Sequence, residues 1–316
     1  MNLRRAARAG AGIAGGAGAL YLAQRAATSR WHVGADELAA AGLTLPADLR
    51  HHFVATSDGG RLHVVERGEG PSFVLVHGIM LGIGIWAPQL RLLGGRVIAV
   101  SQRGHGQSRA GTGGYAFDRL ASDLAEVLDA LEVRDAVLVG HSMGGMIVQQ
   151  CALSHAQACS GRVRRLVLVG TAPGPRPVRP LLTLAGPLAA AALAGAERRG
   201  RGPLPSSAAA WGARLAFGVS PAPASVALVR GMLDAMSPAA LAGLLPPLLA
   251  FYVRDELGGL TLPVHVVVGG SDVLTPPRTA RAIVAGVPDA RLTVLPGCGH
   301  MVMLERQEAL CDLVAG

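Results

Sequence analysis

The stretch Val137–Gly145 constrains the fold of this chain more than any other segment. A short β-branched run, typical of a fully buried strand, meets Gly-His-Ser-Met-Gly, and the apolar residues of 143–154 then follow helical spacing. Ser142 is therefore expected at a sharp strand-to-helix turn, where Gly140 and Gly144 let neighbouring backbone pass close. Gly-x-Ser-x-Gly also occurs in plain glycine-rich loops, so the motif alone is not sufficient. The strand before it and the helix after it are what predict a nucleophilic serine at a helix N-terminus.

The rest of the chain alternates between strand and helix patterns. A hairpin turn is expected at Asp58-Gly59-Gly60, between runs 52–57 and 61–67. Buried strands are expected at 71–76, 96–100, 136–139, 163–169, 263–268 and 291–295. Helices are expected at 118–131, at 275–285 with Thr275 as the N-cap, and at 305–314. This alternation predicts an α/β fold with a mostly parallel sheet that is covered on both faces.

The alternation is interrupted by residues 173–257. This stretch has Pro-rich turns and Ala- and Leu-rich helical patterns, with helices expected at 181–193, 206–217, 223–236 and 238–253, and it has no strand pattern. We therefore divide the chain into an α/β core of residues 51–172 and 258–316 and a helical cap of residues 173–257, inserted after the sixth strand.

Residues 1–31 differ from the rest of the sequence. Arg4, Arg5 and Arg8 precede a run without charges, Ala9 to Ala23, and no acidic residue occurs before Asp36. This layout is typical of a signal peptide or a short membrane anchor. The run is weakly apolar and shorter than the ~20 residues that span a bilayer as a helix, and no clean Ala-x-Ala cleavage site follows. We favour membrane association through this segment, with an exported protein or a cytoplasmic extension as alternatives.

The composition argues against a nucleic-acid-binding protein and against a metal site. The net charge is +8 and every basic side chain is Arg, but basic and aromatic residues do not cluster on a recognisable nucleic-acid-binding module, so no nucleic-acid partner is predicted. The four cysteines show neither metal-ligand nor disulfide-framework spacing. No metal and no cofactor is predicted.

Three residues suited to nucleophilic catalysis follow predicted strands. A serine nucleophile needs a base, and the base needs an orienting carboxylate. Ser142, Asp272 and His300 each come directly after a strand, and the carboxyl ends of parallel strands meet at one edge of a sheet. We expect these three side chains to lie together.

Taken in order, these motifs resemble the α/β-hydrolase superfamily from about His51 to the C-terminus. The matching pieces are His77-Gly78-Ile79, Arg103-Gly104-His105-Gly106-Gln107-Ser108, Gly140-His141-Ser142-Met143-Gly144-Gly145, Gly270-Ser271-Asp272-Val273-Leu274-Thr275-Pro276 and Gly299-His300. One departure is Ser101, where the family often has Asp; this removes a possible carboxylate partner of Arg103.

The resemblance implies a role for each motif. Ser142 attacks an acyl carbonyl, His300 transfers the proton, and Asp272 fixes the imidazole. The oxyanion donors are the backbone N–H groups of Ile79 and Met143. His77, Gly78, Gly140, His141 and Gly144 support these motifs. The family's other position for the acid reads Gly170-Thr171-Ala172 here and has no carboxylate.

A serine at this turn argues against epoxide hydrolases and haloalkane dehalogenases, which use Asp there, and the turn is similar to that of monoacylglycerol lipases. We predict an esterase or lipase that cleaves a small-molecule ester with an apolar or lipid-like acyl group through an acyl-enzyme. Thioesterase, C–C bond hydrolase, cofactor-free haloperoxidase and acyltransferase activities are alternatives, as is a non-catalytic ligand-binding protein. Because the cap is rich in Leu and Met, we expect Met232 and Leu248 to line the acyl site.

Overall fold

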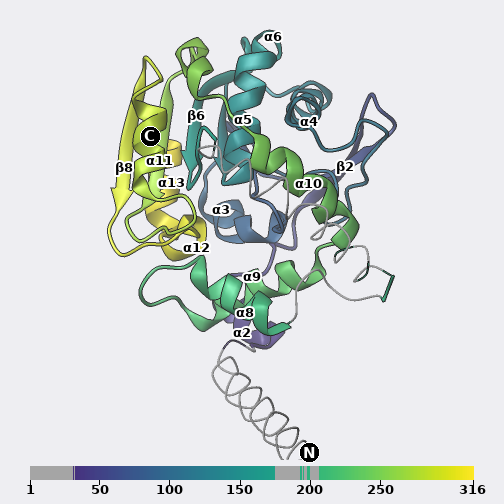
Figure 1. Ribbon diagram of the computed structural model, residues 1–316, viewed down its shortest axis with the longest axis vertical. Coiled ribbons are helices and arrows are strands. Elements are labelled where there is room, and N and C mark those ends of the chain that lie inside the picture. Colours follow the sequence, from purple (N-terminus) through teal and green to yellow (C-terminus); the bar gives the residue numbers. More distant parts are fainter. Residues whose placement is uncertain (1–30, 32, 175–192, 194, 196–197, 200–205) are drawn as a thin grey trace, which may run out of the picture.

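The computed structural model describes residues 31, 33–174, 193, 195, 198–199 and 206–316 (Figure 1). The basic and apolar segment of residues 1–30 and nearly all of the helix expected at 181–193 lie outside the described residues.

An eight-stranded sheet forms the centre of the molecule, in the order β1-β2-β4-β3-β5-β6-β7-β8. β2 runs antiparallel to both of its neighbours, and all other pairs are parallel, which confirms the predicted sheet. The strands are β1 (Arg50–Ala55), β2 (Arg61–Arg67), β3 (Ser72–Val76), β4 (Arg96–Val100), β5 (Ala136–His141), β6 (Val163–Val169), β7 (Val264–Gly269) and β8 (Ala290–Leu295).

Helices cover both faces of this sheet. One buried cluster joins the strands to α4 (Phe117–Ala130), α5 (Met143–Ser154), α6 (Ala156–Cys159) and α11 (Pro277–Val284). A second cluster joins the other face to η1 (Ile83–Trp86), α3 (Ala87–Leu92), α12 (Val302–Glu305) and α13 (Gln307–Ala315). β5 is buried along its whole length, as its β-branched sequence predicts for a central parallel strand.

The described cap helices lie between β6 and β7 in sequence: α8 (Ser206–Leu215), α9 (Pro223–Ala235) and α10 (Pro238–Ala250), followed by η2 (Arg254–Gly259). α9 and α10 begin with proline, and the Ser237 hydroxyl caps α10 by accepting from the N–H of Ala240 at 3.3 Å. In the described part of the chain no single helix has the length and apolar composition to cross a membrane; only α9 and α10 taken together, bent by 100°, meet both criteria.

The segment before β1 packs on the cap. α2 (Ala35–Ala40) contacts α9 at the lower end of the molecule in Figure 1. Trp31 is 3% exposed and meets Trp211 of α8 edge-on, with ring centroids 5.5 Å apart. Trp31, which the sequence placed in the N-terminal segment, and residues 33–50, which it left unassigned, are therefore part of the folded unit.

Several helix boundaries differ from the prediction, and two of them lie near the predicted site residues. The closing helix, expected at 305–314, begins at Gln307 as α13. A short helix that was not expected, α12, precedes it, and Arg306 between them has φ of −138° and ψ of 58°. α11 begins at Pro277 with Pro276 as its N-cap, so the prediction of Thr275 as the cap was wrong. The Thr275 hydroxyl instead donates to the Asp272 carboxylate, which competes with capping for the same side chain.

Candidate active site

Ser142 lies at the tip of the turn from β5 into α5. Its φ of 53° and ψ of −120° form a strained conformation for a residue with a side chain. The flanking glycines are required by the close packing of the turn. A Cβ on Gly144 would lie 2.2 Å from the carbonyl oxygen of Val76, and one on Gly140 would lie 2.6 Å from that of Gly144. The predicted turn is therefore present with the predicted cause.

His300 and Asp272 form a buried pair beyond the ends of β8 and β7. The His300 Nδ1–H donates to Asp272 Oδ2 at 2.8 Å, while Oδ1 accepts the N–H groups of Leu274 and Thr275 at 2.9 and 2.8 Å. Burial raises the pKa of Asp272, but the hydrogen bonds and charge of His300 and the donors of Thr275 outweigh it and leave the pKa below its ordinary value. Asp272 is thus held as an acceptor that fixes the His300 tautomer.

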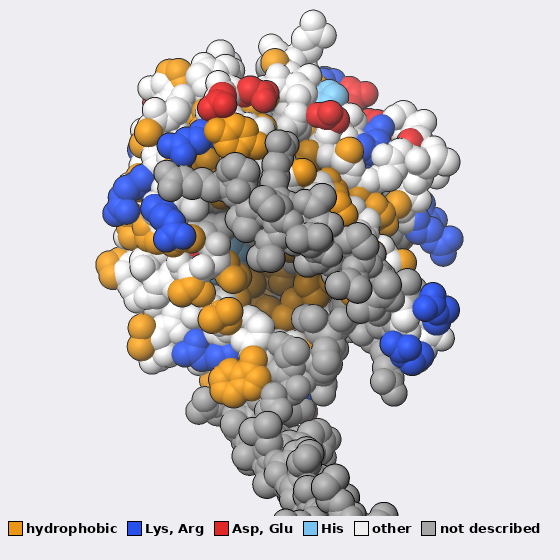
Figure 2. All heavy atoms as spheres, in the orientation of Figure 1, with side chains coloured by type: hydrophobic (Ala, Val, Ile, Leu, Met, Phe, Trp, Pro, Cys, Tyr) orange, Lys and Arg blue, Asp and Glu red, His pale blue; other side chains and the backbone are white. Residues whose placement is uncertain are grey.

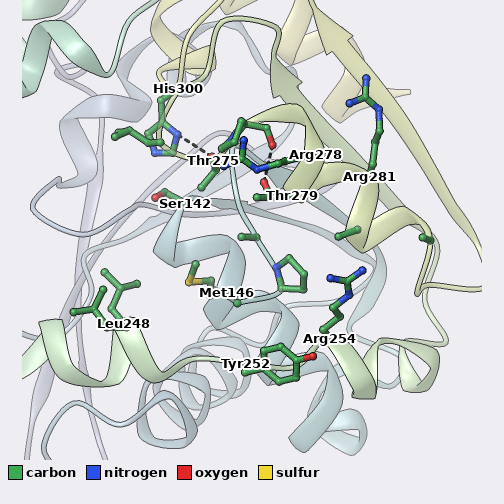
Figure 3. A pocket seen from close by; sticks show the side chains of 18 residues that line it. Ser142, Met146, Leu248, Tyr252, Arg254, Thr275, Arg278, Thr279, Arg281 and His300 are labelled. Atoms are coloured by element: carbon green, nitrogen blue, oxygen red, sulfur yellow. Dashed lines mark hydrogen bonds between the residues drawn. The ribbon is translucent and has the colours of Figure 1, made fainter. Parts of the chain in front are cut away.

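Thr275 is a site residue that the sequence reasoning missed. Its hydroxyl donates to Asp272 Oδ2 at 2.8 Å and lies 3.1 Å from His300 Nδ1, so it touches both members of the pair. Figure 3 shows Thr275 beside His300. The sequence contained one signal, because an Asp tends to form an Asx turn with the residues that follow it. Here the Asp272 carboxylate accepts the N–H groups of Leu274 and Thr275, two and three residues later. That turn brings the threonine hydroxyl back to the carboxylate.

Ser142 and His300 line one cavity of about 800 Å³ (Figure 3). Among the described residues, the Ser142 hydroxyl has no hydrogen-bonding partner. Its backbone carbonyl accepts from the Thr171 hydroxyl at 2.7 Å. Met146 of α5 and Leu248 and Leu249 of α10 give the cavity an apolar side. In Figure 2 this face of the molecule is hollowed near its middle, and the visible floor of the hollow is hydrophobic.

Only one of the two cap residues predicted for the acyl site lies there. Leu248 lines the cavity. Met232 does not, so that prediction was wrong: its side chain packs against Gly84 of η1, where a Cβ would lie 2.9 Å from the Met232 methyl carbon. The apolar face of α9 is turned onto the core and not into the cavity.

The predicted oxyanion donors belong to backbone that surrounds Ser142. A Cβ on Gly78 would lie 3.0 Å from the Ser142 Cβ, so the loop 77–80 passes directly beside Ser142. In the described part of the chain, the N–H groups of Ile79 and Met143 donate no hydrogen bond, which leaves them available to a ligand. Neither residue is among those that line the cavity, so their role stays a prediction.

Two buried neutral histidines hold this loop. His77 Nδ1–H donates to the carbonyl of Gly78 at 2.8 Å, and His105 Nε2 accepts the N–H of Met80 at 3.1 Å. Burial lowers the pKa of His77 to about 3 and that of His105 to about 4. Both rings act as fixed hydrogen-bonding groups at neutral pH.

His141 supports His300 from the other side. Its Nε2–H donates to the carbonyl of His300 at 3.0 Å, and the two ring centroids are 4.6 Å apart. Burial and the neighbouring His300 lower the pKa of His141 well below its ordinary value. A neutral His141 therefore packs against the His300 ring, with the two ring planes tilted by 55°.

Arg103, the residue left without its usual partner by Ser101, finds carboxylates elsewhere. Its guanidinium is fully buried and makes two hydrogen bonds to Asp123 of α4, at 2.5 and 2.7 Å, and two to Asp58 of the β1–β2 hairpin, at 2.9 and 3.2 Å. The Ser101 hydroxyl donates to the carbonyl of His105 at 2.9 Å. The substitution thus leaves Arg103 paired and the turn intact.

No group of three or more His, Cys, Asp or Glu side chains suited to a metal ion occurs within the described ranges. What the site holds is a serine, a histidine paired with an aspartate, and backbone donors.

The chain is similar to known hydrolases. The sequence model of the alpha/beta hydrolase family matches residues 73–313. RutD from Variovorax paradoxus, a proposed carbamate hydrolase, is 31% identical over 244 residues, which cover 73% of this chain and 85% of that protein. A hydrolase from Pseudomonas aeruginosa PA01 has a TM-score of 0.72 at 32% identity, covering 85% of this chain and 98% of that one.

A non-heme haloperoxidase from Rhodococcus erythropolis is 40% identical over a shorter stretch of 124 residues. These cover 38% of this chain and 44% of the relative, so the chain matches less than half the length of that protein.

Proposed function

Because this chain belongs to the alpha/beta hydrolase family, we propose that it is a serine hydrolase that cleaves a carboxylic ester through an acyl-enzyme. The observation that carries the proposal is the shared cavity: Ser142, on its strained turn, and His300, held by Asp272, open into the same space.

The reaction proceeds in two half-steps. Ser142 Oγ attacks the acyl carbon while His300 Nε2 takes the hydroxyl proton, and the backbone N–H groups of Ile79 and Met143 receive the developing oxyanion. Collapse of the tetrahedral intermediate breaks the ester bond, and His300 returns the proton to the departing alcohol. Water then attacks the acyl-enzyme with His300 as base, which releases the acid and restores Ser142. Asp272 keeps Nε2 of His300 free for these transfers through its bond to Nδ1.

The apolar side of the cavity supports an acyl chain as the group bound next to Ser142. Met146, Leu248 and Leu249 lie there, and each methylene that leaves water contributes up to ~0.8 kcal/mol. We therefore expect kcat/KM to rise from acetyl to medium-chain esters. Leu248→Trp should shift the preference toward shorter chains. Met232→Trp, at the position that packs away from the cavity, serves as the matched control.

The test is hydrolysis of p-nitrophenyl esters of graded chain length by the wild-type protein and by Ser142→Ala. The proposal predicts a rate that depends on Ser142 and grows with chain length. A Ser142→Ala variant that is folded and still hydrolyses these esters at the wild-type rate would refute it.

A second candidate is favoured by the haloperoxidase relative. Hydrogen peroxide, in place of water, can attack an acyl-enzyme and release a peroxy acid, which then oxidises a halide. This candidate predicts halogenation of an organic acceptor that requires peroxide, halide, a carboxylic acid and Ser142 together. Halogenation that persists in Ser142→Ala would exclude this route.

A further inference from the structure

The cavity that contains Ser142 has a basic side as well as an apolar one. Arg254 of η2 and Arg278 and Arg281 of α11 all line it, and among the described lining residues there is no Asp or Glu. All three arginines are exposed. We refer to Arg254, Arg278 and Arg281 as the basic arm of the cavity.

Within the described ranges, none of the three guanidinium groups of the basic arm forms an ion pair. Asp255, which follows Arg254 in sequence, accepts a hydrogen bond from the Tyr252 hydroxyl at 3.2 Å. Elsewhere in the chain, arginines do pair with acids: Arg67 with Asp48 at 2.9 Å and Arg96 with Glu66 at 3.1 Å. The positive charge of the basic arm is therefore not neutralised by the described side chains around it.

The two sides of the cavity lie at different ends. In Figure 3, Leu248 lies on one side of Ser142, and Arg254 and Arg281 lie on the other, with Arg278 between them and the Ser142–His300 end. Basic side chains also gather over α11 on the left of Figure 2. A ligand that fills this cavity past Ser142 would meet hydrocarbon at one end and guanidinium groups at the other.

We propose that the basic arm binds an anionic group, a carboxylate or a phosphate, on the alcohol portion of the ester that Ser142 cleaves. The inference rests on the proposed function and adds the class of substrate: an apolar acyl chain esterified to an anionic alcohol. Guanidinium groups match the planar oxygens of both anions and can bind them with two parallel hydrogen bonds. A cleft lined by one sign of charge also raises the local concentration of an oppositely charged substrate.

The experiment compares three substrates with one acyl chain: octanoylglycerol, octanoylglycerol 3-phosphate and O-octanoyl-lactate, each below its critical micelle concentration. For the wild-type protein at low salt, we expect kcat/KM for at least one anionic ester to exceed that for octanoylglycerol about tenfold, the scale of a few exposed charge contacts. The excess should shrink as salt is added. The preferred anionic ester tells phosphate from carboxylate.

The variants are Arg278→Gln alone and Arg254→Gln, Arg278→Gln and Arg281→Gln combined. The ratio of kcat/KM for the anionic to the neutral ester should fall in the single variant and approach one in the triple variant. Arg164→Gln makes the same charge change near the opposite end of the sheet, at the start of β6, and should keep the wild-type ratio.

Equal kcat/KM on all three esters, or a ratio that survives in the triple variant, would overturn the inference. Hydrolysis of octanoylglycerol that is lost in Ser142→Ala tests the proposed function separately. The inference can therefore fail while the proposed function stands.

Discussion

At the scale of single residues, Thr275 links the carboxylate to the imidazole. Replacement by Val keeps the volume but removes the hydroxyl that donates to Asp272 Oδ2. We expect Thr275→Val to lower kcat about tenfold, because a hydrogen bond to a charged group contributes about 1.5–3 kcal/mol and His300 loses part of its support. Thr275→Ser should restore most of the rate. Steady-state kinetics on a soluble ester decides this, and an unchanged kcat in the Val variant would show that Asp272 alone positions His300.

The buried His105 ring should make the free energy of unfolding depend on pH. Its folded-state pKa of about 4 lies below the ~6.5 of an unfolded histidine, so the unfolded chain binds the proton first as pH falls. The stability due to neutral His105 is complete above pH 6.5 and is lost toward pH 4, at about 1.4 kcal/mol per pH unit.

The measurement is urea unfolding at several pH values between 4.5 and 7.5. His105→Gln keeps an acceptor for the Met80 N–H and should flatten the pH slope by that amount. Parallel slopes for wild type and His105→Gln would contradict a neutral buried ring.

Ser142 and Thr275 were not equally predictable from the sequence. The position of Ser142 was predictable, because Gly140 and Gly144 mark a turn that side chains would block. The role of Thr275 was not, since the proline-rich segment after it gives the pattern of a helix start. Its partner His300 lies 25 residues away in sequence, and their contact depends on the pairing of β7 with β8.

At the scale of elements, Glu305 ties the cap to the loop that carries His300. Its carboxylate accepts the N–H of Gly299 at 2.8 Å and that of Gly218, just after α8, at 2.9 Å. Burial raises the pKa of Glu305, and the two N–H donors only partly offset this. We expect Glu305→Ala to lower the free energy of unfolding by about 1.5–3 kcal/mol, because two partly buried N–H groups lose their acceptor.

Denaturant unfolding measures this effect. Glu305→Gln keeps one acceptor and should lose about half as much. The exposed Glu308→Ala, in α13, should stay within about 0.5 kcal/mol of wild type. A Glu305→Ala variant as stable as Glu308→Ala would show that the link contributes nothing.

The strands and helices of the core were largely predictable because their apolar residues recur with the spacing typical of a strand or of a helix. The break at Arg306 was not, since the closing helix was expected to run through it, from 305 to 314. The orientation of α9 could not be predicted either. Met232 and Leu248 are both apolar residues of cap helices, and only the structure shows that Met232 packs against η1 while Leu248 lines the cavity.

At the scale of the whole molecule, we propose that residues 1–30 attach the protein to a membrane. Trp31 is buried against Trp211 and so belongs to the folded unit. On the same cap region, Leu215 and Val219 are 57% and 73% exposed. A chain that starts at Arg30 should therefore leave the membrane fraction, stay folded and keep its kcat/KM on a water-soluble ester.

Fractionation of the full-length and shortened proteins, with activity measured in each fraction, checks this. A full-length protein found wholly in the soluble fraction, or a shortened one that still sediments with membranes, would contradict the proposal. The sequence alone could define this segment by its charges but could not show that Trp31 belongs to the folded unit.

The central claim, that Ser142 becomes covalently acylated, is tested most directly by peptide mapping after reaction with a fluorophosphonate. The account predicts one adduct per chain, on the peptide that contains Ser142, and no adduct in Ser142→Ala. It also predicts slower labelling in His300→Ala, because the base that activates the hydroxyl is missing. An adduct on another residue, or ester hydrolysis that continues when Ser142 is fully labelled, would contradict it.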